Sequence, residues 1–235
     1  MNHHIHCIIP ARKGSKRLVG KNTRLLLGKP LISWTIEEAI RSSGIASITI
    51  STDDESVMEI AKNYGKSIEI LKRPEILAAD DTTTVDVVLH FVSWLNDKGE
   101  NVKHIMLLQP TSPLRTATHI DEAVNNYFSN LDKIDSLISV TKSAHPPWWQ
   151  RKIGENGVLE DVFKYDKSKY KRSQDFPQTY IVNGAIYIIK AESFIKYKGF
   201  ETDKTLAYIM ESNCSIDIDT EFDLMLAEKI AKTYY

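Results

Sequence analysis

Cysteines and long apolar runs are both scarce in this sequence. Its 235 residues contain two cysteines, Cys7 and Cys214, and no apolar stretch long enough to span a bilayer. The start of the chain does not read as a signal peptide. We therefore expect a cytoplasmic protein with free thiols and no membrane partner. His3, His4 and His6 precede Cys7, but strand alternation would divide these four side chains between two faces, which favours a terminus and first strand over a metal site.

An excess of either charge is also absent. Thirty Lys or Arg residues stand against thirty-one Asp or Glu residues, which gives a formal net charge of −1. This balance argues against a general polyanion-binding surface, so we expect no nucleic-acid partner. The positive charge is nevertheless concentrated in one place, because seven Lys or Arg and no Asp or Glu lie between Arg12 and Lys29. That segment is a candidate anion-binding site.

The two common phosphate-loop motifs are missing, since neither G-x-x-x-x-G-K-[ST] nor G-x-G-x-x-G occurs. Instead, an apolar run at 5–9 leads into PARKGSKRLVGKN. Gly14 would let the backbone approach a ligand, Ser15 adds a hydroxyl donor, and Arg12, Lys16 and Lys21 could surround a polyphosphate. A solvated basic loop is the alternative; it would account better for two or three charges than for seven.

Short β-rich segments alternate with segments of helical spacing. The predicted strands lie at 5–9, 47–52, 67–71, 104–109 and 136–141. Between them, apolar residues recur at the helical interval, as at Ile32, Ile36 and Ile40. This alternation predicts a three-layer, Rossmann-like α/β sandwich with a mostly parallel sheet. We expect a single domain over residues 1–235.

The pattern changes after residue 141. Residues 143–178 contain two adjacent tryptophans, a Gly-Glu-Asn-Gly turn at 154–157 that is typical of a β-hairpin, and a long polar run without helical spacing. We interpret this segment as an inserted β-hairpin arm. Such an arm is more often an oligomer contact than a lone flap, although part of a substrate lid is the alternative. A strand is expected at 182–190, and the chain should close with a short strand at CSIDID and a helix.

Two carboxylates near the end of the chain are separated by one residue. In a strand, Asp217 and Asp219 would project from the same face about 7 Å apart, a spacing at which two carboxylates can share a hard divalent cation. The alternative is a helix N-cap, with Asp219 or Thr220 followed by Glu221 and Asp223. Both can hold at once, with Asp217 on the metal.

Two further segments favour polar recognition. LLQPTSPLR leaves a predicted strand through two prolines and should present Gln109, Thr111, Ser112 and Arg115. The three threonines at 82–84 lie at a predicted helix N-terminus, where capping is the default role. A hydroxyl there could also meet a ribose, and Arg73 could meet a base.

Six blocks occur in the order and spacing typical of one enzyme family: PARKGSKRLVGKN, STDDESVMEIAKNYG, KRPEILAADDTTT, LLQPTSPLR, VNGAIYI and SIDIDTEFDL. Over nearly its full length, the chain resembles the acylneuraminate cytidylyltransferases, or CMP-sialic acid synthetases. The resemblance implies an enzyme that joins CTP to the anomeric hydroxyl of a nine-carbon α-keto acid sugar, releases pyrophosphate and uses Mg²⁺. It also implies a homodimer whose hairpin arm reaches the neighbouring subunit's site.

The resemblance further implies roles for individual residues. Arg12, Ser15, Lys16 and Lys21 would hold the triphosphate, Ala11, Asn22, Arg73 and Thr84 would frame the cytidine, Gln109 and Tyr187 would contact the sugar acid, and Asp217 and Asp219 would carry magnesium. Arg12, Lys21 and Asp217 are then the candidate catalytic residues. The expected reaction is in-line attack of the sugar oxygen on the α-phosphorus, helped by cationic side chains and by a metal ion that polarises the α-phosphate.

Departures from the family pattern concern the sugar. Members that use N-acetylneuraminate tend to have a lysine where this chain has Trp148 and an arginine where it has Ile181. Losing these charges removes charge-assisted hydrogen bonds, unless Arg172 or Lys171 compensates. A less polar, 6-deoxy, diacetamido sugar acid of the legionaminic type would suit an apolar pocket better.

Several alternatives remain open at this stage. The sugar could be pseudaminic acid; the LLQPTSPLR and VNGAIYI blocks argue against the eight-carbon acid of lipopolysaccharide. A sugar-1-phosphate nucleotidyltransferase would share the architecture but usually has a glycine-rich first loop. A non-catalytic nucleotide-binding protein of the same fold is the alternative from another class, because fold does not fix function.

Overall fold

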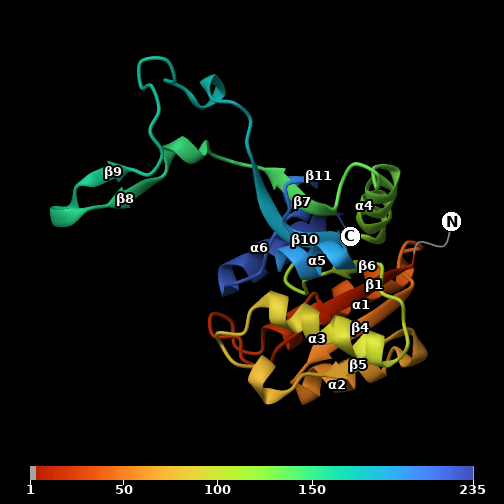
Figure 1. The fold of residues 1–235 in the computed structure, drawn as a ribbon. Coiled ribbons are helices and arrows are strands. Elements are labelled where there is room, and N and C mark those ends of the chain that lie inside the picture. Colours follow the sequence, from red (N-terminus) through yellow and green to blue (C-terminus); the bar gives the residue numbers. More distant parts are fainter. Residues whose placement is uncertain (1–3, 235) are drawn as a thin grey trace.

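The computed structural model describes residues 4–234, which form a seven-stranded sheet in the order β11-β7-β10-β6-β1-β4-β5 (Figure 1). The strands are β1 (Ile5–Pro10), β4 (Ser47–Thr52), β5 (Glu69–Lys72), β6 (His104–Leu107), β7 (Ser136–Lys142), β10 (Tyr180–Lys190) and β11 (Thr205–Met210). Neighbouring strands are parallel except where β10 pairs with β6 and β7. The predicted mostly parallel sheet is confirmed. His3 lies outside the described residues.

Helices cover both faces of this sheet. Helices α1 (Leu31–Arg41), α2 (Glu55–Lys62) and α4 (Ala117–Ser129) share one buried apolar cluster with Ile5, Cys7 and Ile9 of β1. Helices α3 (Thr84–Asp97) and α5 (Ala191–Tyr197) share a second cluster with Ile8. Successive residues of β1 thus point into opposite clusters, as expected for a strand buried on both sides. The three-layer sandwich is confirmed.

Helix α6 (Glu221–Tyr234) packs beside the segment that follows β1. Leu224, Ala227 and Ala231 of this helix join a third apolar cluster with Leu18 and Leu26. Leu26 belongs to a small hairpin made of β2 (Leu25–Leu26) and β3 (Lys29–Pro30). The last part of the chain is therefore held against the basic segment near its beginning.

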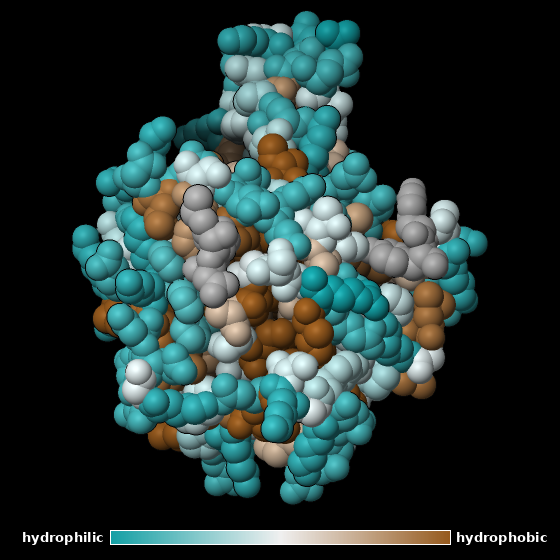
Figure 2. Space-filling model, turned by 90° about the vertical axis from the view of Figure 1, so that its right-hand side faces the viewer, coloured by the Kyte–Doolittle hydropathy of each residue, from teal (hydrophilic) through white to brown (hydrophobic). Residues whose placement is uncertain are grey.

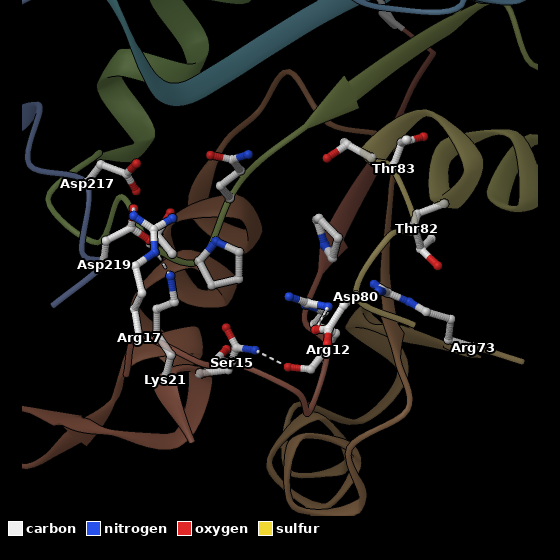
Figure 3. A pocket seen from close by; sticks show the side chains of 17 residues that line it. Arg12, Ser15, Arg17, Lys21, Arg73, Asp80, Thr82, Thr83, Asp217 and Asp219 are labelled. Atoms are coloured by element: carbon white, nitrogen blue, oxygen red, sulfur yellow. Dashed lines mark hydrogen bonds and ion pairs between the residues drawn. The ribbon is translucent and has the colours of Figure 1, made fainter. Parts of the chain in front are cut away.

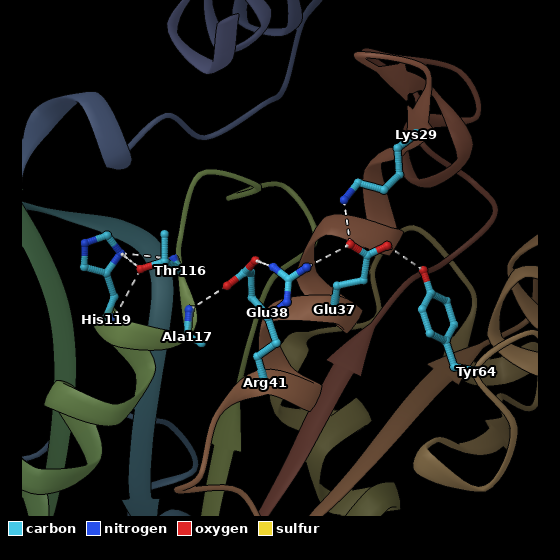
Figure 4. Close-up of polar contacts among 8 residues, drawn as sticks. All are labelled: Lys29, Glu37, Glu38, Arg41, Tyr64, Thr116, Ala117 and His119. Carbon is cyan, nitrogen blue, oxygen red and sulfur yellow. Dashed lines mark hydrogen bonds and ion pairs between the residues drawn. The ribbon is translucent and has the colours of Figure 1, made fainter. Parts of the chain in front are cut away.

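Polar contacts of helix α1 tie this region together (Figure 4). Glu37 accepts hydrogen bonds from Lys29 Nζ at 2.6 Å and from the Tyr64 hydroxyl at 3.1 Å. Glu38 Oε2 accepts a bond of 2.7 Å from the backbone N–H of Ala117 in the first turn of α4. These contacts connect α1 to the β2–β3 hairpin, to the turn after α2 and to α4, and so fix the scaffold under the basic segment.

A long arm leaves the sheet after β7 and returns at β10, and it projects well away from the body (Figure 1). Within it, β8 (Arg151–Ile153) and β9 (Leu159–Asp161) pair antiparallel around a turn in which Asn156 and Gly157 have positive φ values of 59° and 78°. The predicted hairpin and its turn are confirmed.

An aromatic cluster shapes the base of the arm. Phe176, which is 8 % exposed, stacks on Trp148 with ring centroids 5.3 Å apart and on Tyr170 at 4.9 Å. Tyr165 and Trp149 meet the same ring edge-on. Aromatic pairs of this kind stabilise a structure beyond the area that they bury, so the arm has a small core of its own despite having little regular structure.

The structure differs from the sequence-based prediction near the C-terminus. Strand β11 and helices α4 and α5 were not foreseen. The expected strand at CSIDID is wrong: Ser212–Cys214 form a 3₁₀ turn, and 215–219 are irregular. The reason is that β11 already occupies the sheet edge beside β7, and the Ile218 N–H donates instead to the Thr111 carbonyl at 2.8 Å.

The surface is chemically mixed. The face in Figure 2 is mainly hydrophilic, with apolar residues gathered near its centre and the arm above them. Among residues 4–234, no helix combines the length and the apolar character that crossing a bilayer requires.

Candidate active site

A cavity of about 400 Å³ opens at the carboxyl ends of strands β1, β5 and β6 (Figure 3). In open α/β sheets this edge is where ligands bind. The residues lining it are Pro10, Arg12, Ser15, Arg17, Lys21, Asn22, Arg73, Asp80, Thr82, Thr83, Thr84, Val87, Gln109, Pro110, Thr111, Asp217 and Asp219. They come from five separate parts of the chain, and most of them are polar or charged.

The basic loop after β1 is fixed by hydrogen bonds at both ends. Its first residue, Ala11, donates its N–H to the Ser51 carbonyl at 2.9 Å. The Asn22 amide donates to the Arg12 carbonyl at 3.0 Å, and the Lys13 N–H donates to Asp53 at 2.9 Å. Because these bonds hold the backbone, the cationic side chains are presented from a defined loop.

Two carboxylates, on opposite sides of the cavity, each pair with two cations of this loop (Figure 3). Asp219 pairs with Lys21 at 2.7 Å and with Arg17 at 2.8 Å. Asp80 pairs with Lys16 at 2.6 Å and with Arg12 at 3.0 Å. The hydrogen bond from Lys16 is the main reason that the pKa of Asp80 lies below its usual range.

Asp217 has a different environment from Asp80. Burial raises the pKa of Asp217 above its ordinary value, a hydrogen bond from Thr111 opposes this shift, and the charge of nearby Asp219 reinforces it. The segment carrying both aspartates is anchored by the bond from the Ile218 N–H to the Thr111 carbonyl. The two carboxylates therefore lie together without the strand geometry that the sequence suggested.

Helix capping and the aspartate pair are separate features. Thr220 caps α6, since its hydroxyl accepts from the Asp223 N–H at 3.3 Å and the Asp223 carboxylate accepts from the Thr220 N–H at 2.8 Å. Of the two predicted cap residues, Thr220 is the one that caps. Asp217 and Asp219 remain in the cavity.

The aspartate pair fits a hard divalent cation that shares its ligands with a nucleotide. Magnesium prefers oxygen ligands and usually binds through one or two carboxylates, waters and substrate phosphates. Within the described residues, no group of three or more His, Cys, Asp or Glu side chains is placed to hold a metal ion. A cation on Asp217 and Asp219 would thus depend on phosphate and water for its remaining ligands.

Gly184 makes room for a polar side chain beside Asp217. Its φ is +76°, and a Cβ at this position would lie 2.7 Å from Oε1 of Gln109 and 3.9 Å from the carboxyl carbon of Asp217. The pairing of β10 with β7 shifts its register between Val182 and Tyr187, around this glycine. The irregularity lets Gln109 occupy the space in which a side chain would otherwise lie.

Nine of the predicted site residues line the cavity: Arg12, Ser15, Lys21, Asn22, Arg73, Thr84, Gln109, Asp217 and Asp219. The other four lie outside the set of lining residues. Ala11 is buried at the start of the loop, and Lys16 is exposed and paired with Asp80. Tyr187 packs against Phe200 in the apolar cluster between the sheet and helices α3 and α5. Arg172 lies on the arm and pairs with Asp175 at 3.0 Å.

Two residues of the LLQPTSPLR segment are not presented to a substrate. Ser112 is fully buried, and Arg115 is 1 % exposed. The Arg115 guanidinium donates to the carbonyl of Ala185 at 2.9 Å, to the hydroxyl of Thr35 at 2.8 Å and to the carbonyl of Gln109 at 3.3 Å. Arg115 therefore holds the loop from below. Of the four polar residues expected to be presented, Gln109 and Thr111 line the cavity.

The two positions used to judge the sugar also lie away from this cavity in the same chain. Trp148 stacks on Phe176 in the arm, and Ile181 is 59 % exposed at the start of β10. The expectation that they form an apolar pocket with the other site residues is not met within one chain.

Sequence reasoning missed Arg17 and Asp80 as site residues. Arg17 belongs to the basic run, so its charge was counted, but nothing in the sequence placed it opposite Asp219. Asp80 is 68 positions from Arg12. No local pattern links residues so far apart, and only the fold brings them together.

Comparison with known proteins identifies the family. The model of the family described as "Cytidylyltransferase" matches residues 6–234. An N-acylneuraminate cytidylyltransferase of Escherichia coli is 40 % identical over 223 residues, which cover 95 % of this chain but 51 % of that protein. The CMP-N,N'-diacetyllegionaminic acid synthase of Legionella pneumophila is 38 % identical over 231 residues, covering 96 % of this chain and 95 % of that one. The chain thus spans about half the length of the first relative and nearly all of the second.

A solved structure agrees at the level of the fold. A CMP:2-keto-3-deoxy-manno-octonic acid synthetase complexed with CTP superimposes with a TM-score of 0.69 at 17 % identity, and the match covers 99 % of this chain and 100 % of that one. The family model, the Legionella pneumophila relative that matches over nearly its whole length, and the fold all agree. The chain belongs to the cytidylyltransferase family.

Proposed function

We propose that this chain transfers CMP from CTP to the anomeric hydroxyl of a nine-carbon α-keto acid sugar. The observation that supports the proposal most directly is that Arg12, Lys21 and the pair Asp217 and Asp219 meet in one cavity at the carboxyl end of β1. In the proposed reaction, the sugar oxygen forms a bond to the α-phosphorus. At the same time, the bond between the α-phosphorus and the oxygen that bridges to the β-phosphate breaks. Pyrophosphate leaves with the electron pair of the broken bond, and a water molecule accepts the hydroxyl proton.

The cationic and hydroxyl side chains of the basic loop are suited to stabilising the negative charge of the CTP phosphates. Arg12 and Lys21 supply hydrogen-bond donors and positive charge on opposite sides of the cavity, and Ser15 adds a hydroxyl between them (Figure 3). Fixed cations of this kind stabilise the charge that develops on transferring phosphates, and they need little rearrangement because the loop is already ordered. Lys16 lies beside them on the same loop and can reach the outer phosphates.

The cytidine and the sugar acid would occupy the remaining walls. Arg73, after β5, and Thr84, at the start of α3, line the wall where the nucleoside is proposed to lie. Asn22, whose amide donates to the Arg12 carbonyl, and Ala11, at the start of the loop, are proposed to complete the frame of the cytidine. Gln109, next to Asp217, is proposed to contact the sugar acid. Tyr187 is proposed to contact the sugar acid as well; burial and then the charge of Asp217 raise the pKa of its hydroxyl.

Mg²⁺ is the proposed cofactor, held by Asp217 and Asp219. When bound with CTP, it would neutralise phosphate charge and increase the acidity of the attacking hydroxyl. Asp219 is also paired with Lys21 and Arg17, so the same carboxylate can keep these cations near the phosphates.

The sugar is proposed to be N,N'-diacetyllegionaminic acid or an N-acylneuraminic acid, with pseudaminic acid as the alternative. Trp148 and Ile181 favour the legionaminic type of sugar, because they stand where relatives that use N-acetylneuraminate tend to have charged residues. Since neither lines the cavity of its own chain, they would influence the sugar through a homodimer in which the arm reaches the neighbouring subunit. Arg172, on the same arm, would then also lie near the neighbour's sugar.

The test is pyrophosphate release with CTP and Mg²⁺, measured with N-acetylneuraminate, di-N-acetyllegionaminate and pseudaminate at equal concentrations. A preference for di-N-acetyllegionaminate supports the role given to Trp148 and Ile181. A preference for N-acetylneuraminate means that a basic group such as Arg172 supplies the contacts. No release with any of the three acids would instead indicate a nucleotide-binding protein that does not catalyse this transfer.

A further inference from the structure

Asp80 forms ion pairs with Arg12 and Lys16, two side chains that the proposed function assigns to the phosphates of CTP. Its carboxylate accepts from Lys16 at 2.6 Å and from Arg12 at 3.0 Å, and Arg12 also donates to the neighbouring Ala79 carbonyl at 3.3 Å. These contacts place a negative group next to Arg12, on one side of the cavity (Figure 3). A nucleotide and Asp80 would therefore compete for the same two side chains.

The segment carrying Asp80 is weakly attached to the rest of the molecule. Residues 75–83 link a 3₁₀ turn to the start of α3. Among the described residues, the hydrogen bonds of this segment to the basic loop are those made by Arg12 and Lys16. The others close within the segment, on the preceding Pro74 or on the first turn of α3. Releasing Asp80 thus requires the loss of few contacts.

The exposure of their side chains indicates which carboxylate, Asp80 or Asp219, a bound ligand displaces more easily from its cations. The Asp80 side chain is 53 % exposed and that of Lys16 is 74 % exposed, whereas Lys21 is 15 % and Asp219 30 % exposed. Ion pairs between exposed groups contribute little to stability, and they exchange readily for a partner of higher charge. A triphosphate brings several charges to the cavity and would replace the single charge of Asp80.

We propose that Asp80 is a displaceable counter-ion, which holds Arg12 and Lys16 until the phosphates of an incoming nucleotide take its place. This inference rests on the proposed function, because it concerns the same phosphate site. It assigns Asp80 a role in setting nucleotide affinity: every phosphate ligand that needs these cations binds only to molecules in which Asp80 has been released. The apparent affinity is reduced by the released fraction, and by the same factor for each such ligand.

The alternative for Asp80 is a permanent orienting contact. In that case, the carboxylate would stay on Arg12 during binding and aim it at the phosphates. Removing the carboxylate would then weaken binding, whereas removing a displaceable counter-ion strengthens it. The two roles predict opposite signs.

The experiment compares Asp80→Asn with Asp81→Asn. The two substitutions remove the same charge from adjacent positions of one exposed segment, but in the described structure only Asp80 pairs with a cation. Dissociation constants for pyrophosphate, CTP and cytidine are measured by titration calorimetry at one low salt concentration, without sugar acid. Thermal unfolding of both variants confirms that they are folded.

We expect Asp80→Asn to bind pyrophosphate and CTP about three- to tenfold more tightly than Asp81→Asn, by a similar factor for both ligands, and to bind cytidine unchanged. Equal affinities of the two variants, or weaker binding by Asp80→Asn, would overturn the proposal. Pyrophosphate alone suffices for this comparison. If the unaltered chain binds pyrophosphate but not CTP, the proposed function fails while the role of Asp80 is still decided.

Discussion

Two carboxyl groups of the cavity, those of Asp80 and Asp217, have pKa values shifted in opposite directions by their surroundings. Asp80 is exposed and paired with cations, so its pKa lies below the usual range. Asp217 is more buried and close to Asp219, so its pKa is raised. A raised pKa means that the folded chain disfavours the ionised form of Asp217 relative to the unfolded chain. The chain therefore keeps a carboxylate at a position that costs stability, as is common at functional sites.

Asp217→Asn should separate stability from activity. We expect turnover to fall by about 100-fold or more, because the proposed metal loses a ligand. The thermal midpoint should stay equal or rise, because the amide carries no charge to bury beside Asp219. Steady-state pyrophosphate release and a thermal melt measure the two effects. Unchanged turnover would remove Asp217 from the mechanism.

For Arg115, whose role is structural, we expect a substitution to lower stability, in contrast to Asp217→Asn. Burial lowers its pKa to about 10, which still leaves the guanidinium charged at neutral pH. Arg115→Met leaves the acceptors on Gln109, Ala185 and Thr35 without their donor, and we expect a loss of about 2–4 kcal/mol in the free energy of unfolding.

Urea unfolding measures this loss. Arg41→Met is the matched control, because Arg41 is 62 % exposed and its ion pairs with Glu37 and Glu38 should contribute less than about 1 kcal/mol. Equal stabilities of the two variants would contradict the structural role of Arg115.

Among the elements, the arm has its own internal support. The rings of Trp148, Tyr165 and Tyr170 pack on Phe176. These contacts are local to the arm, and the sheet and its helices bury their own apolar clusters. The arm should therefore respond to changes in its aromatic cluster without a matching response in the body.

Phe176→Ala tests this independence. We expect trypsin to cleave the lysine-rich stretch 164–172 about tenfold faster, because loss of the shared ring opens the arm locally. The thermal midpoint of the body should change by less than about 2 °C. Phe163→Ala, which alters an exposed ring of the same arm, should leave the cleavage rate close to that of the unaltered chain. Equal cleavage of both variants would show that the cluster does not hold the arm.

The elements also show which parts of the fold can be predicted from sequence. Strands β1, β4 and β6 are buried on both faces and read as short apolar runs, so they were found. Strand β11 lies at the sheet edge and its residues alternate in exposure, with Ile209 58 % exposed and Tyr208 7 %. Its pattern is therefore weaker than that of a buried strand, and CSIDID is the next segment whose sequence predicts a strand. Contacts between distant segments, such as Asp80 with Arg12, have no local signal at all.

For the whole molecule, the exposed apolar residues of the hairpin suggest what the arm meets. Ile153 is 77 % exposed, Leu159 67 % and Val158 60 %. A projecting hairpin that carries such residues is a typical protein contact, which supports the proposed homodimer. The same arrangement would carry Trp148 and Arg172 toward a neighbouring site.

Replacing both Ile153 and Leu159 with Glu should shift the chain from dimer to monomer in sedimentation velocity, because burying unpaired charges in an apolar contact is unfavourable. Ile195→Glu is the control. Ile195 is 53 % exposed but lies on α5, away from the hairpin, so this variant should remain dimeric. A dimer that persists in the double variant would place the contact elsewhere.

The ion pair between Lys21 and Asp219 joins residues 198 positions apart, so the cavity is assembled from both ends of the described chain. During synthesis, the basic loop leaves the ribosome long before its acidic partner has been translated. Until that partner arrives, a nascent chain has the cations but lacks the opposing wall, and a product terminated before residue 217 would be unable to build the site. The same property suits the molecule to fragment complementation: two halves, each inactive alone, would report their reunion by recovering nucleotide binding.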